Sequence, residues 1–305
     1  MTLLFGSLQL GLIFGLLAFG IYITFRILNI PDLTAEGSFT LGLAISANFT
    51  VHGHPFLGII CAILAGALAG CITGLLQTKL FVHPVLAGIL TMSGLYSINL
   101  AILGSSVNLS LIGHETMFRL ATDAFTFLDK NYTKLIIALV IVVLIGLALT
   151  LFFRTRIGLC IRATGDNDDM VRASSINVHH TKILALAISN ACIGLAGGIY
   201  TQYQGFADIN SGVGILVVGL ASVIIGEAIF GKRSVTIGFV SAVLGSIVYR
   251  FIIAVANKYS FLPATMLRLV SALIVALALS LPAIKHYHTL RKQKSDYKQQ
   301  YKGGN

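Results

Sequence analysis

Long apolar stretches alternate with short polar segments along almost the whole chain, a pattern typical of membrane-spanning helices. A helix that crosses the hydrocarbon core of a bilayer needs roughly 20 predominantly apolar residues. Nine stretches approach this length: 3–25, 36–51, 56–78, 84–103, 132–153, 182–203, 212–230, 235–256 and 263–284. The pattern therefore predicts an all-α polytopic membrane protein with about nine transmembrane or re-entrant helices, within a range of eight to ten.

The stretch at 36–51 is the least regular of the nine. It is short, and it begins beside Pro31, Asp32 and Glu36. Irregular backbone at membrane depth has to be covered by protein or line a cavity, because lipid cannot satisfy its polar groups. We expect a broken or re-entrant helix here.

Three segments are too polar to span a membrane. Residues 105–131 predict a stretch outside the membrane with a short surface helix around Glu115 to Phe127. Residues 154–181 form the longest loop, and residues 285–305 form a basic tail that anionic lipid would attract. The first stretch lacks a basic n-region, so we interpret it as a retained helix rather than a signal peptide.

The composition agrees with a membrane protein. Hydrophobic residues make up 56% of the 305 residues and charged residues only 10%, against about a quarter in soluble domains. The 31 glycines allow helices to approach closely. The four cysteines show no CxxC spacing, and neither His52 with His54 nor His179 with His180 has further ligands nearby in sequence. Neither a disulfide framework nor a metal site is predicted.

The net charge of +10 is distributed unevenly between loops. Cytoplasmic loops of membrane proteins carry an excess of Lys and Arg. If the C-terminal tail is cytoplasmic, fifteen Lys and Arg residues fall on that side, and only Arg119, Lys130, Lys134 and Lys258 fall outside. The charge thus predicts a cytoplasmic C-terminus and, with nine crossings, an external N-terminus. It gives no reason to expect binding to nucleic acid.

A weak internal repeat relates two of the stretches. Gly58, Ala62 and Leu64 in the third stretch recur at one constant offset in the eighth, as Gly238, Ala242 and Leu244. The predicted topology makes the paired stretches run in opposite directions. Inverted repeats of this kind occur in transporters that build a central pathway between the repeats. A chance match among frequent small residues is the alternative.

The loop after the fifth stretch reads RTRIGLCIRATGDNDDMVRASSINVHHTK and has room for one or two short helices. Asp166 or Asn167 could cap a helix whose first turn carries two acidic residues, which suit a helix N-terminus. We expect the apolar side chains of Met170, Val171 and Ile176 to be free to enter a partner's groove. The loop is therefore interpreted as a docking surface.

The order of motifs resembles that of permease subunits of bacterial ABC importers of the branched-chain amino acid, ribose and nucleoside type, closest to single-permease systems proposed for aromatic amino acids. PDLTAEGSFTLGLAISA at 31–47 is similar to an early pore segment of that family, and KLFVHPVLAGILTMSG at 79–94 to a basic-loop and helix-start motif. The most specific stretch is IVVLIGLALTLFFRTRIGLCIRATGDN at 141–167. In the loop, the residues that recur in the family's order are Gly158, Arg162, Ala163, Gly165, Asn167 and Ile176. The chain departs from the family at Asp168 and Asp169, and at Met170, Val171 and Ser175, where an Ala pair and a Gly are usual.

The resemblance implies a transmembrane permease domain at 1–284, with 154–181 as a cytoplasmic coupling loop that contacts the ATPase. The implied coupling residues are Gly158, Arg162, Ala163, Gly165, Asp166, Asn167, Met170, Val171, Arg172 and Ile176. The implied partners are two cytoplasmic ABC ATPase subunits, an extracellular or periplasmic solute-binding protein, a second permease subunit and membrane lipid. For the second permease subunit we prefer another copy of this chain, which gives a homodimer. Because the chain has no GxxxxGK[ST] stretch, ATP would be bound by the ATPase subunits and the chain itself needs no cofactor.

Polar residues inside the apolar stretches are candidates for the pathway, because ionisable groups within a membrane are costly and usually functional. The candidates are Asp32, Thr34, Glu36, Asn48, Arg250 and Arg268. Helix-start capping is the alternative for Asp32 and Glu36, and snorkelling to the headgroups is preferred for both arginines. Glu227 is expected to pair with Lys232, Arg233 or the loop.

The resemblance implies a function in inward transport by alternating access. The implied solute is small and polar, most simply an amino acid. The alternative is an ion-coupled secondary transporter or channel, which would work without an ATPase. An intramembrane enzyme ranks last, because no catalytic cluster of Ser, His and Asp is found in the sequence.

Overall fold

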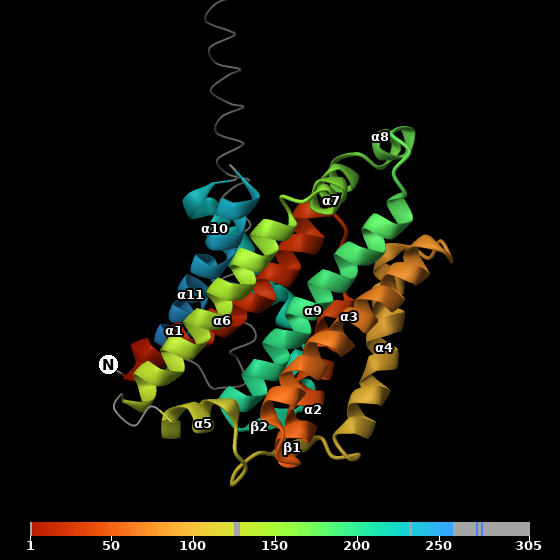
Figure 1. The fold of residues 1–305 in the computed structure, drawn as a ribbon. Helices are drawn as coiled ribbons and strands as arrows, with labels where there is room; N and C mark the ends of the chain where they lie inside the picture. The colour runs from red at the N-terminus through yellow and green to blue at the C-terminus, as the bar shows by residue number, and fades with distance from the viewer. Residues whose placement is uncertain (1, 125–128, 232–233, 259–272, 274–275, 277–305) are drawn as a thin grey trace, which may run out of the picture.

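Hydrophobic helices make up most of the structure, a computed structural model that describes residues 2–124, 129–231 and 234–258 together with residues 273 and 276 (Figure 1). The long helices are α1 (Thr2–Tyr22), α2 (Thr34–Val51), α3 (Pro55–Thr78), α4 (Pro84–Ile102), α6 (Lys130–Phe152), α9 (Val178–Gln204), α10 (Ile215–Phe230) and α11 (Val235–Lys258). Two of them have proline at the first helical position, where it is favoured: α3 begins at Pro55 and α4 at Pro84.

Shorter elements lie at the two ends of these helices (Figure 1). One end, here the α7–α8 end, carries α7 (Arg156–Asp166) and α8 (Asp168–Ala173), and α1 reaches it through the π-helical turn η1 (Ile23–Ile27). The opposite end, the β1–β2 end, carries α5 (Met117–Ala124) and the antiparallel strands β1 (Asn108–Ser110) and β2 (Phe206–Asp208). A 3₁₀ turn, η2 (Ile209–Gly212), leads from β2 towards α10. The helix expected between 105 and 131 is thus confirmed as α5.

Among the described residues, seven helices are long and apolar enough to cross a membrane. The eighth long helix, α2, is not among them, and the predicted ninth stretch at 263–284 lies outside the described residues. The break expected at 36–51 falls earlier in the chain, at η1 and residues 28–33, and α2 itself is unbroken. An intact but rather polar helix is possible here because α2 is buried by protein along most of its length.

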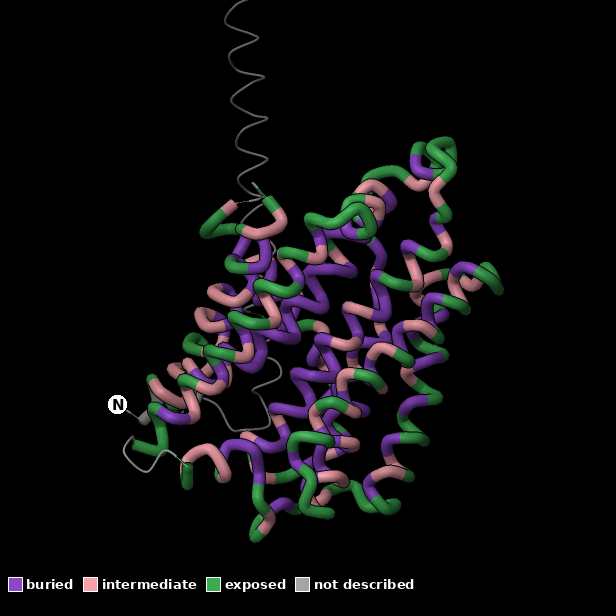
Figure 2. The backbone as a smooth tube through the Cα atoms, viewed as in Figure 1, coloured by how far each residue is buried: buried purple, intermediate pink, exposed green. Residues whose placement is uncertain are grey.

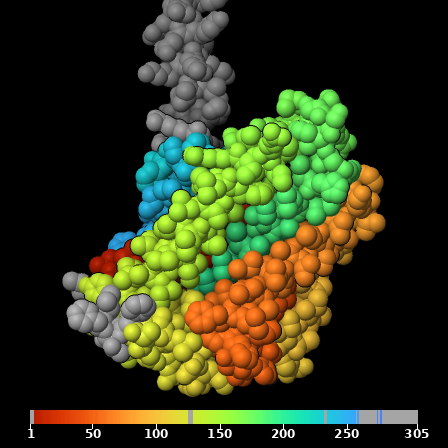
Figure 3. Space-filling view, viewed as in Figure 1, coloured from red at the N-terminus to blue at the C-terminus, as the bar shows by residue number. Residues whose placement is uncertain are grey.

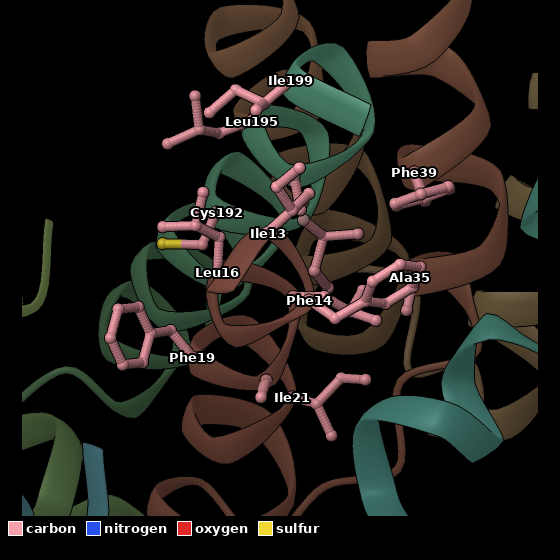
Figure 4. Packing of buried hydrophobic residues seen from close by; sticks show 14 of the residues in the cluster. Ile13, Phe14, Leu16, Phe19, Ile21, Ala35, Phe39, Cys192, Leu195 and Ile199 are labelled. Atoms are coloured by element: carbon pink, nitrogen blue, oxygen red, sulfur yellow. The ribbon is translucent and has the colours of Figure 1, made fainter. Parts of the chain in front are cut away.

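Burial separates the central helices from those at the periphery (Figure 2). In the spans of α1 and α9, 72% of the residues are buried inside the protein, compared with 17% in the span of α6. The apolar side chains that α6 exposes therefore lie on the outside of the described helices. Figure 4 shows the core where Phe14 of α1, Phe39 of α2 and Cys192 of α9 gather.

Glycine allows the helix backbones to approach closely around α9. A Cβ atom on Gly42 of α2 would lie 2.0 Å from the carbonyl oxygen of Gly194, and one on Gly66 of α3 would lie 2.3 Å from that of Asn190. No larger residue fits without moving a helix. Association through small residues is typical of membrane helices, which gain little from hydrophobic burial against lipid.

The directions of the helices agree with the predicted inverted repeat. Helix α9 is antiparallel to α1, because Phe14 of α1 packs near Tyr200 and the later residue Gly20 packs near the earlier residue Ile193. Helix α9 is antiparallel to α3 for the same reason, because Gly66 packs near Asn190 and Gly74 near Ile183. Helix α11 is also antiparallel to α1, so α3 and α11 run in opposite directions between the two ends. This is the arrangement that an inverted repeat requires, and the repeat itself stays a prediction.

Candidate functional site

Helices α7 and α8 meet at Asn167, whose extended backbone ends one helix and starts the next. The side-chain Oδ1 of Asn167 accepts hydrogen bonds from the N–H groups of Asp169, at 3.0 Å, and Met170, at 3.1 Å. This confirms a cap at the predicted place, with Asn167 as the capping residue and Asp166 as the last residue of α7. Two acidic residues in the first turn of α8 add favourable charge at its N-terminus.

Helix α7 is fixed to the helix bundle through a glycine. A Cβ atom on Gly165 would lie 1.8 Å from the carbonyl oxygen of Ile27, the last residue of η1. On the same helix, Oγ1 of Thr164 lies 2.9 Å from Oγ1 of Thr181 in α9. A shift of α7 would therefore act on both η1 and α9, and η1 leads into α2.

Ion pairs extend these connections. Lys182 of α9 pairs with Asp168 of α8, and Arg26 of η1 pairs with Glu227 of α10. The sequence did not point to Arg26 as a partner for Glu227, because the two residues are 201 positions apart. The expected partners Lys232 and Arg233 lie outside the described residues.

The α7–α8 segment projects from the molecule beyond the turn between α3 and α4 (Figure 3). Five of the ten predicted coupling residues are exposed at its surface. Met170 is 56% exposed, and an open hollow of about 340 Å³ lies beside α8, between Arg172 and His179. The exposed members of the predicted set are Arg162, Asp166, Asn167, Met170 and Arg172, the half-buried ones are Ala163, Gly165 and Ile176, and Gly158 is buried.

One expectation for this surface is wrong. Val171 is only 1% exposed, so it is not free to enter a partner's groove as Met170 is. Successive side chains of a helix point about 100° apart, so two neighbouring apolar residues can have different surroundings. Val171 instead faces the protein and holds α8 in place.

The candidates at the start of α2 lie in a buried hydrogen-bond network. Asp32 is 1% exposed, and it accepts hydrogen bonds from the N–H of Thr34 at 2.9 Å and from the Asn190 amide at 2.7 Å. The hydroxyl of Thr34 lies 2.7 Å from that of Thr73, which donates to Thr91 at 3.0 Å. The bond to Thr34 fits the helix-start alternative for Asp32, and the network joins α2, α3, α4 and α9.

Glu36 lies one turn further along α2, beside a cavity of about 320 Å³. One carboxylate oxygen of Glu36 accepts a hydrogen bond from the N–H of Gly214, at 3.0 Å, where α10 begins. The cavity lies between α2, α4 and η2, and it is lined by Glu36, Gly37, Thr40, Met92, Ser93, Tyr96, Asn99, Ile209, Gly212 and Val213. Glu36 thus lies beside a space large enough for a small solute.

The remaining pathway candidates are placed elsewhere. Asn48 donates to the carbonyl of Ile102 at 2.9 Å and so ties α2 to the end of α4. The guanidinium carbon of Arg250 lies 3.5 Å from the centre of the Phe14 ring. The snorkelling predicted for Arg250 is therefore wrong, because its charged group stays inside the protein on an aromatic face. Arg268 lies outside the described residues.

Sequence reasoning missed several residues of these networks, notably Asn190, Thr73 and Asn99. A signal was present for the two asparagines, since each is a strongly polar residue in an otherwise apolar stretch. Thr73 gave no such signal, because a threonine hydroxyl can bond to its own helix, as Thr73 does with the Ala69 carbonyl.

Comparisons with known proteins place the chain in a family of transport proteins. Residues 3–279 match the family described as the permease component of branched-chain amino acid transport systems. The chain is 37% identical to a tyrosine transport system permease protein of Clostridioides difficile over 266 residues, which are 87% of this chain and 86% of that protein. No solved structure matches the chain.

More distant relatives carry names for other solutes. A probable branched-chain amino acid transport permease of Methanocaldococcus jannaschii is 27% identical over 221 residues, 68% of this chain and 69% of the relative. A D-allose transport system permease of Escherichia coli is 28% identical over 215 residues, 68% of this chain and 63% of the relative. The chain is a multi-pass membrane protein that belongs to the family of permease components of ABC-type transport systems for amino acids and sugars.

Proposed function

We propose that the chain is the translocation subunit of an importer that moves an amino acid inward by alternating access, driven by separate ATPase subunits. The observation that carries this proposal is the close contact of Gly165 with Ile27 behind the exposed face of α7 and α8. A partner that pulls on the exposed face would move η1 and, with it, the start of α2. Coupled movement of packed helices is a common way to convert one state of a transporter into another.

The distribution of charge supports a cytoplasmic location for the α7–α8 end. Seven Lys and Arg residues belong to turns or helix ends there: Arg26, Lys79, Arg154, Arg156, Arg162, Arg172 and Lys182. The other end carries Arg119 in α5, Lys130 and Lys134 at the start of α6, and Lys258 at the end of α11. The excess follows the positive-inside tendency.

The proposed assembly contains two copies of this chain, two ATPase subunits and a solute-binding protein on the outside. Residues 1–284 form the permease domain in this proposal, residues 154–181 the coupling loop, and the basic residues 285–305 contact anionic lipid. For the solute we propose an aromatic amino acid, since the relative with 37% identity is named for tyrosine transport.

Uptake by proteoliposomes tests the proposal. The chain is reconstituted with its ATPase and solute-binding protein, and uptake of each labelled amino acid is measured with ATP and with a non-hydrolysable analogue inside the vesicles. We expect uptake of an aromatic amino acid when the vesicles contain ATP and no uptake when they contain the analogue. Uptake by the chain without ATPase, driven by a sodium or proton gradient, would instead establish the ion-coupled alternative.

A further inference from the structure

The described residues that line the cavity between α2, α4 and η2 supply hydrogen-bond acceptors and no positive charge. Its lining includes the carboxylate of Glu36, the amide of Asn99 and the hydroxyl groups of Thr40, Ser93 and Tyr96. No Lys or Arg is among the lining residues that the structure describes. A solute that carries a positive group is therefore better matched to this cavity than one that carries only a carboxylate.

Asn99 supplies an acceptor with no partner. The residue is 1% exposed, and its amide nitrogen donates to the carbonyl oxygen of Gly37 at 3.3 Å. Because a carbonyl can only accept, this bond fixes which end of the amide faces Gly37. The other end, Oδ1, is buried and has no hydrogen-bond partner among the described residues. A buried acceptor that is left unpaired is costly, so this atom indicates a place for a donor.

The start of α10 would ordinarily favour an anion, since the N-terminus of a helix carries partial positive charge. Here the carboxylate of Glu36 already accepts from the N–H of Gly214. The positive end of α10 is thus neutralised by the protein, and a second carboxylate beside Glu36 would be repelled. A cation beside Glu36 would be attracted.

Irregular backbone brings these groups together. The chain returns into the bundle after β2, and a Cβ atom on Gly212 would lie 2.1 Å from Oγ1 of Thr40 and 2.5 Å from the carbonyl oxygen of Glu36. Non-helical backbone at this depth occurs where it lines a cavity, and discontinuous helices of this kind form the solute sites of many transporters.

We infer that this cavity binds the protonated amino group of the transported solute, with Glu36 and Asn99 as acceptors and with Met92, Tyr96 and Ile209 around the rest of the molecule. The inference rests on the proposed function and adds to it the part of the solute that the permease itself recognises. The volume of about 320 Å³ is at the lower limit for small-molecule sites and admits one amino acid.

Protection of a cysteine from labelling tests occupancy directly. In a chain whose four native cysteines are replaced by alanine, Ser93→Cys places a thiol at the cavity, and Ser97→Cys places one on the exposed part of the same helix outside it. The assembled transporter is treated with a maleimide in the presence of L-tyrosine, of tyramine, which lacks the carboxylate, or of 3-(4-hydroxyphenyl)propionate, which lacks the amine. We expect tyrosine and tyramine to slow labelling of the Ser93→Cys variant severalfold and to leave labelling of the Ser97→Cys variant unchanged.

Equal protection by the compound without an amine would overturn the inference, as would no protection by tyrosine in a complex that imports tyrosine. If the wild-type complex imports no amino acid, the proposed function fails instead. The two failures are thus distinguishable.

A charge-removing variant gives a second test. Glu36→Gln keeps one oxygen that can accept from Gly214, replaces the other with an amide NH2 group and removes the charge. We expect the ratio of imported amino acid to hydrolysed ATP to fall about tenfold, because charge-assisted hydrogen bonds are the stronger ones. Glu115→Gln, at an exposed position outside the cavity, is the matched control and should transport normally. Normal transport by Glu36→Gln would contradict the inference.

Discussion

The carbonyl oxygen of Ile27 faces Gly165 so closely that a Cβ atom on that glycine would lie 1.8 Å away. This contact joins the exposed α7–α8 segment to η1, the turn that precedes the central helix α2. In the proposed function, this contact transmits movement of the ATPase subunits to the helices of the permease domain.

Replacing Gly165 with alanine should therefore uncouple the transporter. The added methyl group has to push α7 away from η1, so we expect transport per hydrolysed ATP to fall about tenfold or more while the complex still assembles. Uptake and ATP hydrolysis are measured on the same proteoliposomes. Gly6→Ala, where a Cβ atom would meet nothing within 4 Å, is the control. Equal coupling in both variants would show that this contact transmits no force.

Substitutions of Asn167 should destabilise α8 to different degrees, according to how well the new side chain caps the helix. Asn167→Ala removes the acceptor for two N–H groups and should destabilise α8 by about 1 kcal/mol, whereas Asn167→Ser or Asn167→Asp should retain most of the cap. We expect affinity for the ATPase, measured by titration in detergent, to fall about fivefold in the alanine variant and by less than about twofold in the serine variant. Equal loss in both would mean that the side chain contacts the ATPase directly.

Met170 and Val171 are neighbours with opposite environments, 56% and 1% exposed. Met170→Asp should leave thermal stability unchanged and weaken ATPase binding, because the exposed thioether is the one available to a partner. Val171→Asp buries an unpaired carboxylate and should lower the melting temperature of the purified chain by several degrees. If Met170→Asp binds the ATPase normally, the docking surface lies elsewhere.

The threonine network should contribute to stability. Thr73→Val keeps the shape of the side chain and removes its hydrogen bonds with Thr34 and Thr91, so we expect a loss of about 1–2 kcal/mol in the free energy of unfolding. Thr73→Ser retains the hydroxyl and should lose less. Thr122→Val, at the surface of α5, is the control for the substitution itself. A loss no larger than that control would show that the network adds nothing to stability.

Hydrophobic pattern alone was sufficient for peripheral helices such as α6, because such a helix is apolar along its whole length. It was insufficient for α2, whose polarity suggested a break although protein buries most of the helix, and Thr34, Ser46 and Asn48 form hydrogen bonds with α3, α9 and α4 respectively. The cap at Asn167 could be predicted, since capping depends on local sequence. The environments of Arg250 and Glu227 could not, because each is decided by a residue distant in the chain, Phe14 for Arg250 and Arg26 for Glu227. The burial of Val171 depends on how α8 packs against α7 and α9.

Cross-linking from single positions shows whether the ATPase docks on the α7–α8 end, on which the proposed coupling depends. A photoreactive side chain at Met170 on that end is compared with one at Ile112, which is 88% exposed near the β1–β2 end. We expect the ATPase to be captured from Met170 and not from Ile112. Capture from Ile112, or from neither position in a complex that transports, would contradict the proposed function.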